Sequence, residues 1–442
     1  MMRLALPILA AVIIASAAPA AIYYDEARQC LRVVDFPADA PCTLARLLAM
    51  DRLYGWGKVA YDAATDTTTV TGDLWVGAND GTETCLQIGS PEHPRETLVM
   101  QGSLVLHPYW IQGDNREDDY WKAPKRANRL TLGVAGKPEI TAALKFRDQE
   151  RAGHTLYLGR FPATDAPRVN TTGGQLFVHH SLITSALAGQ TFGLKVEHYG
   201  MNLTGDTVVL DHATISWVQG AATYGMGTPR AKVSDTTFDH VGTAIINDRH
   251  DLTRCTFTNC GIAVRDYGSI DAVLTDCVFR GNDHNWTLNY SDKGLVCIDC
   301  TWDTPRQGDT YQCWKNPQTS KTQYPSFTSM RHIIVEVLDE AGKPVAGATV
   351  RIRPAGGAAE LSQNTTPTTD QQGRTPGRGQ EGAVLLAEVV KQATDQPNQP
   401  RVTEFSYSLE ASAKGFAPTK LTGFRPAESW QVVKLTLRRP LP

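Results

Sequence analysis

The side chains best suited to chemistry in this chain of 442 residues follow three short apolar segments. The segments read TAIIND over residues 243–248, GIAVRDY over 261–267 and WTLNYSD over 286–292. We expect Ile245, Val264 and Leu288 to point into a core, since side chains alternate between the two faces of a strand. The polar side chains that follow them form a set called the polar strip below: Asn247, Asp248, Arg249, His250, Arg265, Asp266, Tyr267, Asn289 and Tyr290.

Two reactions suit the polar strip. A polysaccharide lyase neutralises a uronic carboxylate and removes the adjacent proton, and Arg265 or a Ca²⁺ ion held by Asp248 and Asp266 suits the first task. Arg265, His250 or Tyr267 suits the second. An inverting hydrolase instead needs two carboxyl groups about 6.5–9.5 Å apart. Asp248 and Asp266, on neighbouring strands about 5 Å apart, are compatible with that distance, so the reaction type stays open.

Functions without catalysis suit the same residues. Asn247, Arg249, Asn289 and Tyr290 are candidates for substrate binding, but outward strand faces are also polar simply because they meet water. Trp110 and Trp121 flank an acidic loop over residues 114–119 and are candidates for stacking on sugar rings. His179 and His180 are adjacent in a strand-like segment, so we expect them to point to opposite faces and to be structural.

A recurring sequence motif indicates how these segments are positioned. It reads VSDTTF (233–238), LTRCTF (252–257), LTDCVF (274–279) and VCIDCTW (296–302), with a weaker copy, LDHATI, ending at Ile215. Apolar residues that repeat about every 20 positions are typical of a solenoid, whose repeats bury their apolar faces only by stacking. Because each repeat is strand-like, we expect stacked coils of parallel strands.

The N-terminal region carries export and capping signals. Met1-Met2-Arg3, an apolar run and Ala18-Pro19-Ala20 predict a signal peptide over residues 1–20, and hence a secreted, periplasmic or extracellular protein. No later stretch is apolar enough to span a bilayer, so we expect no membrane span after cleavage. Residues 21–58 contain a predicted helix from Cys42 to Leu53, placed to cover the open end of the solenoid.

Two groups stand out among the nine cysteines. Cys30 and Cys42 are close in sequence near the N-terminus, and we expect them to form a disulfide in an oxidising compartment. Cys255, Cys277 and Cys300 share one phase of the repeat, two residues before its aromatic position. We expect their side chains to stack as buried thiols rather than to bind a metal.

Charge narrows the class of partner. The chain has 43 basic and 46 acidic residues and a formal net charge of −3, with no basic footprint for nucleic acid. We expect a polysaccharide or cell-surface glycan as the partner, and Ca²⁺ is the one cofactor that the carboxylates suggest. The sequence leaves the oligomeric state open.

Residues 59–303 resemble the pectin-lyase-like superfamily of right-handed parallel β-helices. The resemblance lies in the coil pattern, including the order Phe257-Thr258-Asn259-Cys260-Gly261-Ile262. It implies a secreted carbohydrate-active protein, a polysaccharide lyase or glycoside hydrolase, although fold alone does not set function. The Asn-Thr-Asp, Asp-Asp and Gly-His-Gly motifs of polygalacturonases are absent. The alternative is a non-catalytic glycan-binding, adhesion or structural protein.

Residues 304–330 are rich in Pro, Gln, Thr and Ser, and we expect a linker there. The segment that follows has a strand, a turn over residues 339–344 and the sequence Val345-Ala346-Gly347-Ala348-Thr349-Val350. Residues 331–442 therefore resemble carboxypeptidase-regulatory-like domains, which implies an immunoglobulin-like β-sandwich without peptidase activity. Residues 383–390 are apolar and are expected to form a helical insertion. The expected fold is all-β: a β-helix with an N-terminal helix cap, then the sandwich.

Overall fold

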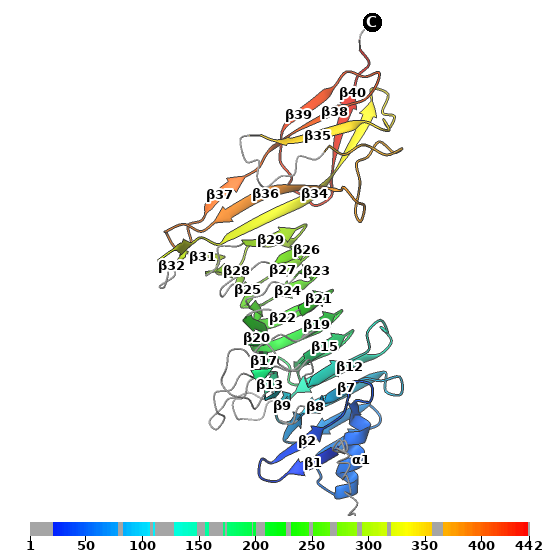
Figure 1. Ribbon diagram of the computed structural model, residues 1–442, viewed down its shortest axis with the longest axis vertical. Coiled ribbons are helices and arrows are strands. Elements are labelled where there is room, and N and C mark those ends of the chain that lie inside the picture. The colour runs from blue at the N-terminus through cyan, green and yellow to red at the C-terminus, as the bar shows by residue number, and fades with distance from the viewer. Residues whose placement is uncertain are drawn as a thin grey trace, which may run out of the picture.

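The computed structural model describes residues 21–440, with gaps at 78–82, 107–108, 111–127, 148–154, 159–170, 173–174, 197, 200–207, 227–230, 247–250, 266–271, 290–293, 316–319 and 356–365. The predicted signal peptide lies outside these residues. The protein is all-β, as expected: one short helix accompanies long stacks of parallel strands (Figure 1). Within the described ranges no helix has the length and apolar character needed to cross a membrane.

A hairpin and a helix lie at the N-terminal end of the stack (Figure 1). Strands β1 (Ala21–Asp25) and β2 (Cys30–Val34) pair antiparallel, and helix α1 (Leu44–Tyr54) follows. The Thr43 side chain caps the helix by accepting from the Arg46 N–H, and Gly55 ends it in the left-handed conformation at φ 67°. Leu44 and Leu47 are fully buried in the main core, so the predicted helix is confirmed.

The coils present three faces of parallel strands. The first face runs from the N-terminal end toward the C-terminal domain and consists of β3 (Cys42–Thr43), β7 (Cys85–Ile88), β11 (Arg129–Leu132), β15 (Gln175–His179), β19 (Val208–Asp211), β21 (Ala231–Ser234), β23 (Leu252–Thr253), β26 (Val273–Thr275), β29 (Gly294–Ile298) and the start of β34 (Ser326–Asp339). Each of these strands pairs in parallel with the next.

The second and third faces share two long strands, β20 (Thr214–Met226) and β22 (Thr237–Ile246), which pass through the corner between them. The second face also contains β8 (Arg95–Met100), β12 (Thr141–Phe146), β16 (Leu182–Ser185), β24 (Thr256–Thr258), β27 (Val278–Arg280) and β30 (Thr301–Trp302). The third contains β9 (Leu104–Leu106), β13 (Thr155–Leu158), β17 (Phe192–Val196), β25 (Ile262–Arg265), β28 (His284–Leu288) and β31 (Thr310–Tyr311).

Shorter strands complete the stack at its ends and edges. They are β4 (Val59–Asp62), β5 (Thr67–Val70), β6 (Asp73–Val76), β10 (Tyr109–Trp110), β14 (Thr171–Thr172), β18 (His198–Tyr199), β32 (Trp314–Lys315) and β33 (Thr322–Gln323). Strands β2, β5 and β6 continue the parallel pairing toward the N-terminal end, because β2 pairs with β6, β6 with β9 and β5 with β8.

The aromatic positions of the recurring sequence motif stack on one another in the core and form what we call the aromatic spine. Phe238, Phe257 and Phe279 are in register and fully buried, and their ring centroids are 5.2 and 4.9 Å apart. Ile215 precedes them in the same register, and Trp302 follows them. Such offset ring stacks add to the free energy gained from burial alone. The predicted stacking of the repeats is confirmed.

The C-terminal region has its own core between two sheets. Strand β34 pairs with β36 (Val384–Gln392) and β40 (Gln431–Leu437), and β37 (Arg401–Glu404) extends β36. The opposing sheet consists of β35 (Thr349–Pro354), β38 (Tyr407–Ser412) and β39 (Thr419–Phe424). Their apolar side chains form a cluster separate from the main core.

Strand β34 joins the two cores without a break. Its first residues, Ser326–Met330, pair with the last coil, and Ile333–Asp339 pair with β40. Between them Arg331 is buried and donates to Glu388, to the Cys300 carbonyl and to Ser429. The end of the segment expected to be a linker is therefore strand.

Two further expectations are wrong. Residues 384–392 are strand β36 and not a helix, because they find a partner edge in β34 and pack inward through Val384 and Leu386. Cys30 and Cys42 are buried free cysteines with no disulfide between them. Their strands, β2 and β3, belong to different sheets.

The aromatic spine predicts where the stack is most sensitive to mutation. Replacing Phe257 by Ala removes the middle ring and leaves a cavity between two others, so we expect a loss of about 3–5 kcal/mol of unfolding free energy. Guanidinium unfolding followed by tryptophan fluorescence measures this loss. Thr258→Ala, on the outward side of the same strand, is the control, with an expected loss below about 1 kcal/mol. Equal losses in both variants would contradict the assigned core.

Candidate functional site

A single residue with left-handed backbone makes the corner between the first and second faces. From β15 to β29, each first-face strand ends, one residue takes a positive φ, one buried residue follows, and the second-face strand begins. Positive φ is uncommon outside glycine, with Asp, Asn and His the best tolerated. The side chains at this position form what we call the corner ladder: His180, His212, Asp235, Arg254, Asp276 and Asp299, with φ between 50° and 55°.

The residue after each corner position points inward and is small. Ser181, Ala213, Thr236, Cys255, Cys277 and Cys300 occupy this inner ladder, and all are buried. The predicted cysteine stack is confirmed, since the Cys277 N–H donates to the Cys300 sulfur at 3.4 Å and the adjoining strands are in register. Among the described residues these thiols form no metal-binding group. The cysteines therefore fill a narrow corner of the core.

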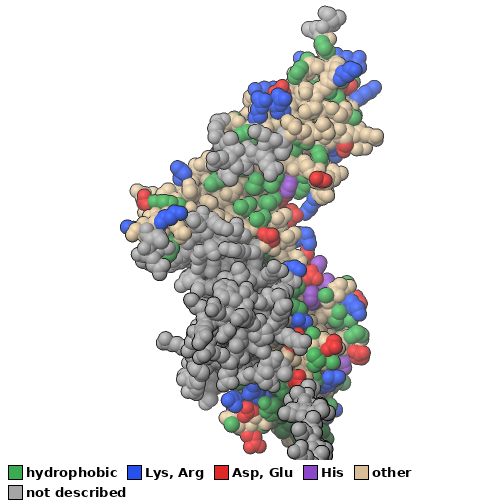
Figure 2. All heavy atoms as spheres, in the orientation of Figure 1, with side chains coloured by type: hydrophobic (Ala, Val, Ile, Leu, Met, Phe, Trp, Pro, Cys, Tyr) green, Lys and Arg blue, Asp and Glu red, His purple; other side chains and the backbone are tan. Residues whose placement is uncertain are grey.

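Each aspartate of the corner ladder has a basic partner. Arg254 donates two hydrogen bonds of 2.6 Å to Asp235, and Arg378 from the C-terminal region donates one of 2.6 Å to Asp276. Asp299 accepts from the His332 N–H at 2.9 Å and lies 2.6 Å from its imidazole. Figure 2 shows histidine, acidic and basic side chains together along this edge of the stack.

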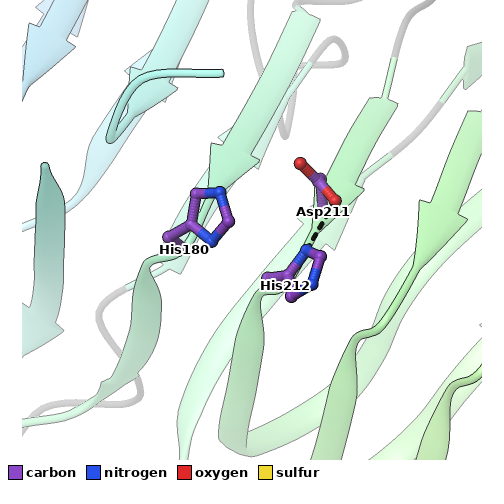
Figure 3. A group of neighbouring side chains, drawn as sticks. All are labelled: His180, Asp211 and His212. Atoms are coloured by element: carbon purple, nitrogen blue, oxygen red, sulfur yellow. Dashed lines mark hydrogen bonds and ion pairs between the residues drawn. The ribbon is translucent and has the colours of Figure 1, made fainter. Parts of the chain in front are cut away.

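Two histidines and an aspartate gather where the ladder begins. The rings of His180 and His212 lie with centroids 4.8 Å apart and planes tilted by 31° (Figure 3). Asp211, which precedes His212, accepts from its Nδ1 at 2.8 Å. One potential ligand atom from each of His180, Asp211 and His212 lies within 4.8 Å of the others, and no other such group occurs in the described part of the chain.

A fourth polar residue lies behind this cluster. His179 is in register with Asp211 on the first face, is buried, and places its Nδ1 3.6 Å from Asp211 Oδ2. Burial lowers the pKa of His179, although Asp211 acts in the opposite direction. Burial would raise the pKa of Asp211, but the hydrogen bond from His212 and the nearby imidazoles of His179 and His180 together lower it. Both shifts have their causes within this cluster, so the two side chains influence each other's protonation.

The expectation that His179 and His180 oppose each other across a strand missed this cluster. His179 ends strand β15, but His180 has φ 50°, so strand alternation no longer applies to it. The sequence contained the information needed to find this cluster, because HHSLI at 179–183 and DHATI at 211–215 occupy equivalent positions in successive repeats. Aligning these two segments as successive coils pairs His179 with Asp211 and His180 with His212.

The structure describes only part of the polar strip. Arg265 is the last residue of β25 and is half-buried, with Ile246 and Thr287 as its partners on the neighbouring coils. The inward positions Ile245, Val264 and Leu288 are fully buried, as predicted. However, Val264 is in register with Trp286, and Arg265 is therefore in register with Thr287. Asn289 lies two residues further along the chain than Thr287, so it is not directly beside Arg265.

The remaining predicted site residues cannot be compared with the prediction. Those outside the described residues are Asn247, Asp248, Arg249, His250, Asp266, Tyr267, Tyr290 and Trp121. Trp110 belongs to β10, which pairs antiparallel with β14, and its side chain is outside the description. All of these residues follow third-face strands in the chain, at the junction where the chain returns to the first face.

Among the described residues, two polar atoms on or just after the strand beside Arg265 are buried without a hydrogen-bond partner. They are Thr287 Oγ1 and Asn289 Oδ1, both on or beside β28. Most buried polar atoms in proteins find a partner, so each exception needs a reason, and an unfilled binding function is one. Asn289 was among the predicted site residues, whereas Thr287, which is in register with Arg265, was not.

No protein-family model matches the chain, and no curated protein matches it by sequence. The function has to be argued from the residues themselves.

Asp299, the last residue of the corner ladder, is expected to make the stability of the protein depend on pH. Burial opposes ionisation of Asp299, but hydrogen bonds from the His332 side chain and N–H outweigh it and lower its pKa. A lowered folded-state pKa stabilises the protein above the unfolded-state pKa of about 3.9, and that contribution is lost as pH falls through the folded value. We expect Asp299→Asn to cost about 1–3 kcal/mol at pH 7, because a buried hydrogen-bonded charge is removed.

Urea unfolding between pH 7 and pH 3 tests this sign. The stability difference between wild type and Asp299→Asn should narrow as the pH falls below about 4. Asp276→Asn, one coil away, is the matched control, since it removes a partly exposed ion pair with Arg378 and should cost less than about 1 kcal/mol. A difference for Asp299→Asn that stays constant over this range would show that its carboxylate charge is not responsible.

Proposed function

We propose that residues 59–303 form a right-handed parallel β-helix of the pectin-lyase-like type and that residues 331–442 form an immunoglobulin-like sandwich related to carboxypeptidase-regulatory-like domains. Three faces of parallel strands and the in-register aromatic spine support the first assignment. The two sheets around a separate apolar cluster support the second. The expected signal peptide at residues 1–20 makes this an exported protein.

The function we propose is recognition of an acidic polysaccharide along the ends of the third-face strands. The observation that carries this proposal is the group formed by Arg265, Thr287 and Asn289. Arg265 is in register with Thr287 on the next coil, and Asn289 follows Thr287 two residues later; Thr287 Oγ1 and Asn289 Oδ1 are buried without hydrogen-bond partners among the described residues. Sugar hydroxyls can donate to such oxygens, and a uronic carboxylate suits the guanidinium.

Lyase chemistry is the reaction that this group favours. Arg265 would neutralise the uronic carboxylate and so make the neighbouring proton easier to remove. His250 or Tyr267 would take that proton, and Asp248 and Asp266 would hold Ca²⁺ if the reaction needs it. A hydrolase would instead use the same two carboxyl groups as acid and base.

A non-catalytic surface protein is the second candidate, and one observation favours it. Strand β34 runs unbroken from the last coil into the C-terminal core, and the buried Arg331 ties the two together. A stiff connection of this kind suits a spacer that presents a docking module away from the stack. Such a protein would bind glycan without cleaving it.

Purified protein assayed against neutral and acidic polysaccharides, with and without Ca²⁺, tests these alternatives. We expect retention on acidic glycans, and Arg265→Gln should weaken binding by about 10- to 100-fold, the effect of losing one charge-assisted hydrogen bond. Absorbance near 235 nm would report a lyase, and new reducing ends without that absorbance would report a hydrolase. Retention without either product would identify a binding protein.

The matched control is Arg280→Gln. Arg280 is an exposed arginine at the end of β27 on the second face, so its loss changes net charge equally but leaves the third face intact. Equal losses in the two variants would indicate non-specific charge attraction. Absence of binding and of product for every glycan would overturn the proposal.

A further inference from the structure

We propose that His180, Asp211 and His212 form a binding site for a divalent transition-metal ion, with Zn²⁺ as the best-matched ion. Two imidazole nitrogens and one carboxylate oxygen are ligands that Zn²⁺ accepts, at about 2.0–2.2 Å each. Calcium and magnesium prefer oxygen ligands alone and fit this set poorly. The site lies at the corner between the first and second faces, away from the polar strip of the proposed glycan function.

The distances already approach those of a bound metal. Ligand atoms about 2.1 Å from a tetrahedral ion are about 3.4 Å from each other. The His212 Nδ1 and Asp211 Oδ1 atoms are 2.8 Å apart, and all three potential ligand atoms lie within 4.8 Å of one another. Metal binding would replace the hydrogen bond between His212 Nδ1 and Asp211 Oδ1, so His212 would coordinate through Nε2, or through Nδ1 once its proton has moved to Nε2. His180 and Asp211 are partly buried and His212 is exposed, which leaves the side chains room to turn toward the ion.

The backbone holds the two histidines one coil apart. The His180 N–H donates to the Asp211 carbonyl at 2.9 Å, and the His212 N–H donates to the Ser234 carbonyl at 3.1 Å. Both residues have the same left-handed φ, so their side chains leave the corner in matching directions, as Figure 3 shows. A metal site built on such a framework loses little conformational entropy when the ion binds.

A second Asp–His pair, formed by Asp239 and His240, serves as a comparison for the cluster. His240 occupies the corner between the second and third faces, and its Nδ1 lies 3.0 Å from Asp239 Oδ1, much like His212 and Asp211. Its neighbour on the preceding coil is Trp217, whose ring stacks on it at 4.0 Å. The Asp–His pair is therefore common to both corners, but only His180 adds a second imidazole.

The interior side of the cluster also favours a cation. His179 is buried, its Nδ1 has no hydrogen-bond partner within the described residues, and it lies 3.6 Å from Asp211 Oδ2. It can serve as a fourth ligand, or it can orient Asp211 from behind once that carboxylate turns to the metal. Either arrangement leaves at most one or two metal positions open to water from the exposed side.

The test uses tag-free protein, freed of metal by chelator and titrated with ZnCl₂ in a calorimeter. We expect one equivalent to bind with a dissociation constant below about 10 μM, and Co²⁺ to give the visible absorption of a low-symmetry site with nitrogen and oxygen ligands. His180→Asn and His212→Asn should each weaken binding by more than about 100-fold. Zn²⁺ should also raise the melting temperature of wild type and of neither variant.

His240→Asn is the matched control, because it removes a histidine from the equivalent Asp–His pair and should leave Zn²⁺ affinity unchanged. Circular dichroism establishes that all variants keep their β-structure. The proposal is overturned if wild type binds no stoichiometric metal below about 100 μM, or if His180→Asn and His212→Asn bind as wild type does. Glycan binding by these variants separates the two proposals, since loss of metal should leave it intact.

Discussion

The structure depends on the one-residue corner between its first and second faces. There a single left-handed residue and a small buried one reverse the chain, and the N–H of the left-handed residue donates to the coil that follows. This repeats from His180 to Asp299, so every coil enters the second face at the same height. Left-handed backbone costs about 1–2 kcal/mol per residue, which the regular hydrogen bonding and core stacking of each coil offset.

That constraint accounts for the main features of the sequence. The inner corner position admits only small side chains, which explains the run of Ser, Ala, Thr and Cys. Constant corner height brings Phe238, Phe257 and Phe279 into register two residues further on. In the last coil, β29 pairs in the same way with the start of β34. The rest of β34 pairs with β40 in the C-terminal core, so one strand connects the two regions.

Sequence reasoning succeeded where one physical signal dominated. The all-β class, the aromatic spine, the cysteine stack and helix α1 followed from spacing alone. It erred in β28, where Trp286 and Leu288 both point inward, so apolar alternation did not reveal which one faces Val264. It also missed the pairing of His180 with His212, because period-two alternation was applied across a corner where the backbone is left-handed. The disulfide failed because closeness in sequence carries no information about which sheet each cysteine joins.

The corner also explains why chemistry can gather there. Because the backbone and the inner residue fix the turn, the left-handed residue needs only to tolerate its φ, and its side chain is free to vary. Along most of the ladder this freedom gives aspartates that are paired with basic side chains, such as Asp235 with Arg254 and Asp276 with Arg378. At His180 and His212 the ladder residues are two stacked imidazoles, and Asp211 beside them is hydrogen-bonded to His212. A metal ion restores at that position the charge balance that ion pairs supply elsewhere, which is why the ladder and the proposed site follow from the same turn.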